Sequence, residues 1–316
     1  MTVAWKTQNE RGSRWLMRLI TWITLTIGRP AGRLLLYPIC LYFVLFSVRT
    51  RNASRQFLAR VMDRPVGFRD VFAHYHTFAA TILDRVYLLS GRHKYFDVAV
   101  HDAEALWQAL ALKRGCMLLG SHLGSFEVLR AYGMFERDLA VNVLMHADHA
   151  EKINSVLHGL HPDIRPRIIP LGQPETLLRV KECVDRGEIV GVLGDRLFHD
   201  EKALACRFVG ADAAFPQGPL LLASILQVPV VLFFGLYGGG RRYDIHFEPF
   251  AERIVLERKR READLQPWLQ RYAARLEHYC RMAPLNWFNF YDFWTPPAGK
   301  PVRPSRPVAQ TPAEHS

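Results

Sequence analysis

The stretch Cys116-Met-Leu-Leu-Gly-Ser-His122-Leu-Gly-Ser-Phe-Glu127 is the part of the sequence that best indicates the fold. Its first five residues are apolar or glycine, which is typical of a short strand buried on both faces. Ser125 is a suitable N-cap for a following helix, and Glu127 would then lie in the first helical turn. The stretch therefore predicts a buried strand, a turn that carries His122, and a helix.

The same alternation of strands and helices continues on both sides of this stretch. Further segments with a strand-like apolar pattern are 95–100, 139–145, 167–170, 189–193, 228–236 and 243–248. Segments with helical periodicity are 54–90, 103–112, 150–160, 176–186, 218–226 and 262–282. Such alternation predicts an α/β fold with a largely parallel or mixed sheet covered by helices on both faces.

The chain divides into three regions by composition. Residues 1–50 are basic and apolar, and we interpret them as a helical membrane anchor. Residues 51–294 form the predicted α/β catalytic domain. Residues 295–316 contain six prolines and predict a disordered tail.

The net charge of +11 is concentrated near the N-terminus. Residues 1–60 contain ten basic side chains and one acid, a net +9 of that +11. A nucleic-acid-binding module would carry its basic face on the folded domain, so this distribution argues against nucleic acid as a partner. Basic residues that flank an apolar segment instead favour an anionic membrane surface.

Two apolar runs in this region, 15–27 and 34–48, are both shorter than the roughly 20 residues of a transmembrane helix. Pro38 is expected to kink a helix through the second run. A signal peptide and a buried core helix are the alternatives. We favour an anchor that lies in or dips into the membrane, with arginines that extend to its surface.

Ligands of open parallel sheets bind beyond the carboxyl ends of the strands. Two polar segments take that position here: Ser121-His122 after the strand at 116–120, and Gly194-Asp195-Arg196 after the strand at 189–193. Both segments are therefore candidates for a functional site.

A histidine followed five residues later by a carboxylate is a weak signal, because about one match is expected by chance in such a chain. The spacing occurs three times, at His122/Glu127, His146/Glu151 and His158/Asp163. The second pair lies in a polar loop and the third brackets a helix exit, where solvated or capping roles are expected. His122 follows a buried strand between two glycines, so we interpret His122/Glu127 as the catalytic pair.

This pair suits acyl transfer to a hydroxyl group. A neutral imidazole can take the proton of the hydroxyl as it attacks an acyl carbonyl, which contributes about 10²–10⁴-fold to the rate. A carboxylate on the other ring nitrogen fixes the tautomer. Gly124 leaves room for a substrate carbonyl to approach.

Other catalytic and metal motifs are missing from the sequence. It contains no G-x-S-x-G, Walker A, G-x-G-x-x-G or H-E-x-x-H motif. The five cysteines are scattered without a C-x-x-C pair, which argues against a disulfide framework or zinc ribbon. The cluster His146-Ala-Asp148-His149 has no matching partner elsewhere, so we expect no metal and no cofactor.

The segment 118–127 resembles the H-x4-[DE] block of the lysophospholipid acyltransferase superfamily, and is most similar to its lipid A late (lauroyl/myristoyl) acyltransferases. Three other segments share this resemblance: Arg186-Gly-Glu-Ile-Val-Gly-Val-Leu-Gly-Asp195, Phe215-Pro-Gln-Gly218-Pro219, and Val228-Pro-Val-Val231. The resemblance extends over about residues 10–294.

The resemblance implies a membrane-associated α/β acyltransferase at the cytoplasmic face of a bacterial inner membrane. It implies an acyl thioester donor, acyl-carrier protein or acyl-CoA, and a lipid or glycolipid acceptor. His122 would be the general base and Glu127 its partner, and the substrate would contact Gly124, Asp195, Arg196, Phe215 and Gly218.

The sequence departs from the family pattern in two places. Arg196 stands where lipid A enzymes usually have glutamine, and it adds a fixed charge suited to a phosphate or carboxylate. The segment 286–294 is unusually aromatic, which fits an acyl groove, a membrane interface or core packing. The acceptor, whether lipid A, an aryl-polyene, an aminolipid or another lipid, therefore stays open.

Two alternative functions remain on the sequence alone. The same pair could activate water, which would make the protein an acyl-thioester hydrolase. A non-catalytic membrane scaffold that docks a carrier protein is the second alternative, and the glycine-flanked His/Glu pair argues against it.

Overall fold

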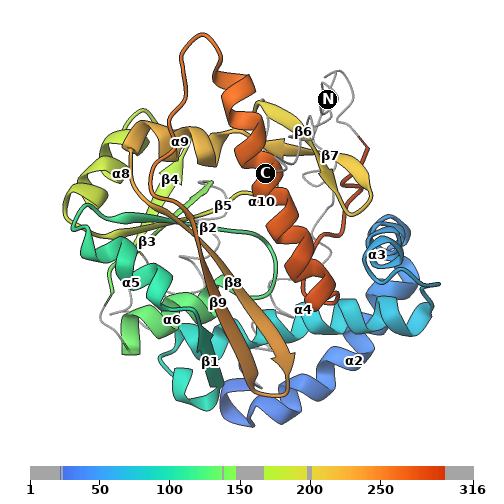
Figure 1. Cartoon of the computed structure of the whole chain (residues 1–316). Coiled ribbons are helices and arrows are strands. Elements are labelled where there is room, and N and C mark those ends of the chain that lie inside the picture. Colours follow the sequence, from blue (N-terminus) through green and yellow to red (C-terminus); the bar gives the residue numbers. More distant parts are fainter. Residues whose placement is uncertain (1–21, 23, 137–138, 147–166, 198–200, 296–316) are drawn as a thin grey trace, which may run out of the picture.

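The computed structural model describes residues 22, 24–136, 139–146, 167–197 and 201–295. It confirms the predicted α/β fold: a mixed seven-stranded sheet has the order β1-β9-β8-β2-β5-β3-β4, and a separate two-stranded sheet pairs β6 with β7 (Figure 1). The strands of the large sheet are β1 (Asp97–His101), β2 (Cys116–Gly120), β3 (Val141–His146), β4 (Ile168–Leu171), β5 (Ile189–Leu193), β8 (Val230–Gly239) and β9 (Arg242–Ala251). The small sheet consists of β6 (Ala203–Phe208) and β7 (Ala211–Pro216).

Strand β2 lies at the centre of the large sheet, and all five of its residues are buried. It pairs in parallel with β5 on one side and with β8 on the other. The pair β8–β9 is antiparallel, whereas the other neighbouring strands of the sheet run in parallel. The carboxyl ends of β2 and β5 therefore lie side by side, with Gly120 in register with Leu193.

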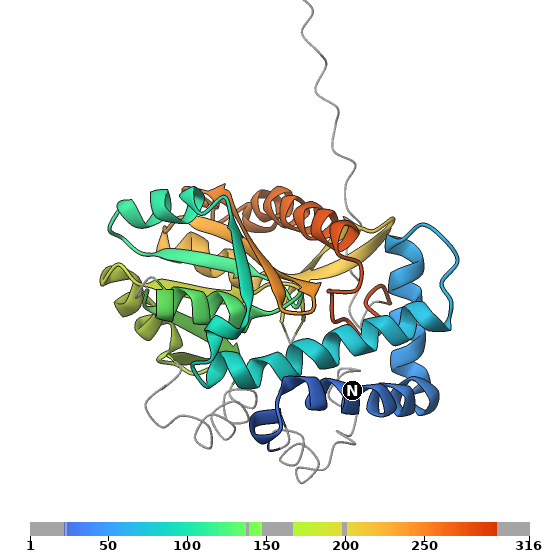
Figure 2. The ribbon, with the colours of Figure 1, turned by 90° about the horizontal axis from the view of Figure 1, so that it is seen from below.

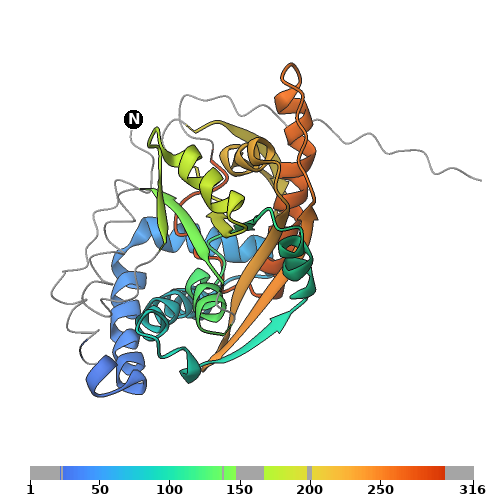
Figure 3. The ribbon, with the colours of Figure 1, turned by 90° about the vertical axis from the view of Figure 1, so that its left-hand side faces the viewer.

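Helices cover both faces of this sheet. Figure 2 shows α10 on one side of the sheet and α4, with α2 outside it, on the other, and Figure 3 shows the same layers from a perpendicular direction. The helices are α2 (Arg29–Phe46), α3 (Val48–Val61), α4 (Phe68–Leu89), α5 (Glu104–Ala111), α6 (Phe126–Glu136), α8 (Thr176–Asp185), α9 (Gly218–Leu226) and α10 (Arg261–Met282), with a short 3-10 turn η1 (His93–Tyr95).

The N-terminal apolar run forms one helix, α2, with Pro38 inside it. By length and composition alone, α2 is the one helix in the described part of the chain that could cross a membrane. Three predicted segments lie wholly or mostly outside the described residues. They are the other apolar run at 15–27, the helix at 150–160 and the tail from 296.

The aromatic segment 286–294 packs into the core rather than lining an open groove. Trp287 is fully buried, and its ring lies 4.8 Å from each of the rings of Phe57 and Phe293. Phe57 belongs to α3, so the segment ties the N-terminal helices to the sheet. Core packing is therefore the reading that the structure supports for this segment.

Candidate active site

The two polar segments predicted at strand ends meet in the structure. The amide of Gly194 donates a hydrogen bond to the carbonyl of Gly120 at 2.9 Å, which continues the β2–β5 pairing beyond the strands. The chain then turns, and Ser121-His122 comes next to Asp195. Parallel neighbours place the ends of both strands at one edge of the sheet, as the sequence predicts.

Asp195 holds His122 by its side chain and its backbone. Nδ1 of His122 donates to Oδ1 of Asp195 at 2.8 Å, and the backbone amide of His122 lies 3.1 and 3.0 Å from the two carboxylate oxygens. The indole Nε1 of Trp287 donates to Oδ2 of Asp195 at 2.9 Å. The carboxylate therefore fixes the ring orientation and leaves Nε2 of His122 as the acceptor nitrogen.

Asp195 is fully buried, yet its environment favours the anion. Burial acts to raise the pKa of the Asp195 carboxyl, but the charge and hydrogen bond of His122, the charge of Arg196 and the indole of Trp287 outweigh it and lower that pKa to about 2. Asp195 is thus ionised at neutral pH.

His122 is held in the neutral form. Burial lowers the pKa of its imidazole, the charge of Arg196 lowers it further, and Asp195 opposes both. The side chain is still 28% exposed. A neutral imidazole with a free Nε2 can accept a proton from a substrate that reaches it.

Gly124 is required by the turn that follows His122. Its φ is +72°, and a Cβ there would lie 1.9 Å from the carbonyl oxygen of Gly235 on β8. The Gly124 amide donates to the carbonyl of Asn286, and the amide of Ser125 donates to the carbonyl of Gly235, both at 2.8 Å. This glycine allows β8 and the aromatic segment to contact the turn directly.

Glu127 lies in the first helical turn, as predicted, but its carboxylate pairs with Arg85 instead of His122. It lies in the first turn of α6, and its carboxylate pairs with Nε of Arg85 on α4 at 3.0 Å and lies 3.5 Å from Oγ of Ser125. Asp195, not Glu127, takes the hydrogen-bonding position at Nδ1 of His122. The reason is geometric: the first turn of α6 directs Glu127 towards α4, while the end of β5 places Asp195 beside the imidazole. A catalytic role for Glu127 stays a prediction.

Arg196 lies at the same edge of the sheet. It donates from Nη2 to the carbonyl of Phe288 at 2.7 Å, and its guanidinium lies 6.0 Å from the ring centre of Tyr291. Its charge lowers the pKa of both His122 and Asp195. Arg196 therefore adds a permanent positive charge to the site.

Two of the predicted substrate-binding residues, Phe215 and Gly218, lie outside the large sheet, in β7 and at the start of α9. Phe215 lies in β7, one residue before its end, and is fully buried. Its ring packs edge-on against Tyr272, whose hydroxyl donates to the carbonyl of Gly120 at 2.7 Å. Gly218 begins α9, and a Cβ there would lie 2.5 Å from Oε1 of Glu201. Phe215 supports the strand end beneath His122, and contact of Phe215 or Gly218 with substrate stays a prediction.

The sequence did not single out three residues that act on this site. Trp287 holds Asp195, Arg85 holds Glu127, and His74 donates from Nε2 to the carbonyl of Trp287 at 2.9 Å. The aromatic segment was a signal for Trp287. Nothing in the sequence marks Arg85 or His74, which lie on one helix far from the motif.

The other histidine–carboxylate pairs are largely outside the described residues. His146 ends β3, while Asp148, His149, Glu151, His158 and Asp163 fall in the undescribed range 147–166. In the part of the chain that the structure describes, no cluster of three potential metal ligands occurs.

These features define a class: a mixed α/β protein with a partly exposed histidine paired to a buried aspartate at the carboxyl ends of its parallel strands. The family model for bacterial lipid A biosynthesis acyltransferases matches residues 8–295, and the chain belongs to this family. Membership confirms the resemblance drawn from the sequence and supports acyltransferase activity in lipid biosynthesis. A search of curated proteins found no match.

Proposed function

We propose that this protein transfers a fatty acyl group from an acyl thioester, acyl-carrier protein or acyl-CoA, to a hydroxyl or amine of a lipid or glycolipid acceptor. His122 is the general base, and Asp195 is the carboxylate that orients it. The observation that carries this assignment is the 2.8 Å hydrogen bond from His122 Nδ1 to a fully buried Asp195. We place the reaction at the cytoplasmic face of a bacterial inner membrane.

The transfer proceeds by general-base catalysis. Nε2 of His122 takes the proton of the acceptor hydroxyl while its oxygen attacks the thioester carbonyl carbon. Asp195 stabilises the imidazolium that forms, because its carboxylate stays ionised beside Nδ1. The tetrahedral intermediate then breaks its C–S bond, and the leaving thiolate receives the proton from Nε2.

Positive charge at the site favours an anionic substrate. Arg196 and Arg85 both lower the pKa of His122 through their charge, so both lie near the imidazole. The carboxylate of Glu127 pairs with Arg85 and fixes its position. We propose that Glu127 acts through Arg85, and that the two arginines hold a phosphate or carboxylate of the donor or acceptor.

The decisive experiment compares His122→Ala with His146→Ala in a membrane assay with an acyl-carrier-protein donor. We expect His122→Ala to abolish transfer while the protein still folds, because the backbone amide of His122 and Trp287 continue to hold Asp195. His146→Ala should retain most of the activity. Full activity in His122→Ala would disprove the mechanism.

Product analysis separates transfer from hydrolysis. With a lipid extract as acceptor, we expect acylated lipid as the main product. Equal amounts of free fatty acid with and without the extract would instead identify a thioesterase. Lipid profiling of a deletion strain by mass spectrometry then identifies the acceptor and the acyl chain.

A further inference from the structure

Helix α2 has one buried stripe and a broad exposed apolar surface. The buried residues recur at helical spacing and are Arg29, Gly32, Leu36, Cys40 and Val44. Large apolar side chains on the rest of the helix are 42–70% exposed: Leu34, Tyr37, Leu41, Tyr42, Leu45 and Phe46. A contiguous apolar surface of this kind indicates an interaction site, whereas exposed apolar residues that are scattered singly do not.

This surface belongs to a helix that lies along the protein rather than projecting from it. Figure 2 shows α2 running beside α4. Arg29 at its start pairs with Asp84 near the end of α4, while the ring of Tyr37 lies 4.7 Å from that of His76 and 6.1 Å from that of Phe72. The two helices are therefore antiparallel neighbours over much of their length.

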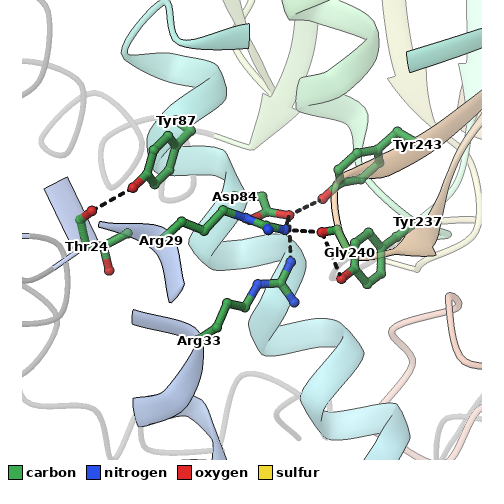
Figure 4. Close-up of polar contacts among 8 residues, drawn as sticks. All are labelled: Thr24, Arg29, Arg33, Asp84, Tyr87, Tyr237, Gly240 and Tyr243. Atoms are coloured by element: carbon green, nitrogen blue, oxygen red, sulfur yellow. Dashed lines mark hydrogen bonds and ion pairs between the residues drawn. The ribbon is translucent and has the colours of Figure 1, made fainter. Parts of the chain in front are cut away.

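A buried ionic cluster fastens α2 at its first turns (Figure 4). The fully buried carboxylate of Asp84 accepts from Nε and Nη2 of Arg29 at 2.7 and 2.9 Å and from Nη2 of Arg33 at 2.9 Å. It also accepts from the hydroxyl of Tyr243 on β9 at 2.9 Å. Arg29 further donates to the carbonyl of Gly240. Detaching α2 would leave Asp84 buried without either arginine, which is strongly unfavourable.

A helix held in this way is poorly placed to span a bilayer. Crossing the membrane in the docked position would carry α4 into the hydrocarbon, and α4 contains Arg69, Asp70, Asp84 and Arg85. In addition, 18 residues of α2 extend about 27 Å, slightly less than the roughly 30 Å of a hydrocarbon core. The docked position suits a helix that lies parallel to the membrane surface.

The charge around this surface identifies its partner. Described residues from 22 to 62 contain six arginines and no acid. Arg49 and Arg55 on α3, directly after the apolar surface, are exposed. A second copy of the chain would place like charges opposite one another, whereas anionic phospholipid headgroups complement them.

We propose that the exposed face of α2 and the start of α3 form a non-spanning membrane-binding surface for anionic phospholipid bilayers, fixed to the catalytic domain by the Asp84 cluster. The apolar side chains enter the boundary between headgroups and acyl chains, and the arginines contact the headgroups. Both ends of α2 then lie on the same side of the membrane as the catalytic domain. This proposal is independent of the reaction proposed above.

Flotation of the purified protein with vesicles of phosphatidylethanolamine and phosphatidylglycerol tests the surface. The double variant Leu34→Glu/Leu45→Glu should bind at least tenfold more weakly than wild type. The matched control Leu178→Glu/Ile225→Glu replaces residues on α8 and α9 that are 61% and 62% exposed, between the 70% of Leu34 and the 49% of Leu45, and should bind like wild type. Equal binding by both variants, or a dimer that only the first variant dissociates, would overturn the proposal.

Labelling with a membrane-impermeant maleimide tests the topology. Cysteine is introduced at Ile27, at Asn52 or at Glu252, and the five native cysteines are buried. We expect Ile27→Cys and Asn52→Cys to react from the same side as Glu252→Cys, or to be protected on both sides until detergent is added. Reaction of Ile27→Cys from the opposite side would show that α2 spans the membrane and disprove the proposal.

Native cysteines report on the Asp84 cluster. Cys40 lies in the buried stripe of α2, and Cys280 is buried in α10. Asp84→Asn should make Cys40 reactive towards maleimide while Cys280 stays protected, as mass spectrometry can resolve. Unchanged protection of Cys40 would contradict the role of the cluster. If both cysteines react, Arg33→Gln, which removes one of the two arginines that join α2 to Asp84, should expose Cys40 selectively.

Discussion

The carboxylate of Asp195 lies 2.8 Å from Nδ1 of His122, although 73 residues separate them in the chain. The five-residue spacing suggested Glu127 as the partner of the imidazole, but the structure gives that position to Asp195. The contact arises because β2 and β5 are parallel neighbours whose ends lie in register. The pair therefore depends on the sheet, not on a local turn.

Replacing Asp195 should cost far more activity than replacing Glu127. In Asp195→Asn, an amide group can donate to Nδ1 of His122, which places the ring proton on Nε2 and removes the base. We expect kcat to fall by about 10³–10⁴-fold, measured as initial rates of acyl transfer. Glu127→Gln keeps the shape of the side chain but loses the ion pair with Arg85, so its main effect should be on KM. A larger kcat loss in Glu127→Gln than in Asp195→Asn would return the orienting role to Glu127.

Substitution of Gly124 should destabilise the fold locally and strongly. A Cβ at this position would lie 1.9 Å from the Gly235 carbonyl, and the residue has a φ of +72°. We expect Gly124→Ala to lower the free energy of unfolding by about 3 kcal/mol or more, measured by urea denaturation in detergent. The control is Gly210→Ala, where φ is +79° but no atom lies within 4 Å of the added Cβ. That variant should lose only about 1 kcal/mol, and equal losses would contradict the steric argument.

His74 predicts a pH dependence of stability. Its imidazole is fully buried, accepts from Oγ of Ser54 at 2.8 Å and donates to the carbonyl of Trp287. Burial lowers the pKa of His74 to about 4, although the bond to Trp287 opposes this. In the unfolded chain the pKa of this imidazole is near 6.5. The contribution of His74 to the free energy of unfolding is therefore fully present above pH 6.5, and it is lost as the pH falls from there through 4.

The expected loss from this one group is on the order of 3 kcal/mol between pH 7 and pH 4. Urea unfolding at a series of pH values should show a shallower dependence in His74→Gln than in wild type over this interval. The exposed His278→Gln serves as the control and should keep the wild-type dependence. Parallel curves for wild type and His74→Gln would show that His74 is not the group responsible.

Local patterns were sufficient for the strands that position the site. Periodicity and composition predicted the bounds of β2 and β5, because both are short apolar runs between polar turns. The same patterns did not reveal the hairpin β6–β7 or the contact of Trp287 with Asp195. The hairpin is local, with only Val209 and Gly210 between its strands, but both strands are rich in alanine, which is not typical of strands. The contact of Trp287 with Asp195 joins positions 92 residues apart, and the order of residues along the chain does not specify such a contact.

Arg196 predicts a shift in the pH profile of the reaction. Burial is the largest cause that lowers the pKa of His122, and the charge of Arg196 is the next. His122 must be neutral to act as a base, so the acid limb of kcat/KM follows its pKa. Removing the charge in Arg196→Gln should raise that pKa and move the acid limb to higher pH. Arg196→Lys keeps the charge but not the guanidinium geometry at Phe288, so the limb should stay near its wild-type position even where KM rises. An unchanged limb in Arg196→Gln, or an equal shift in both variants, would mean that the arginine acts by packing rather than by its charge.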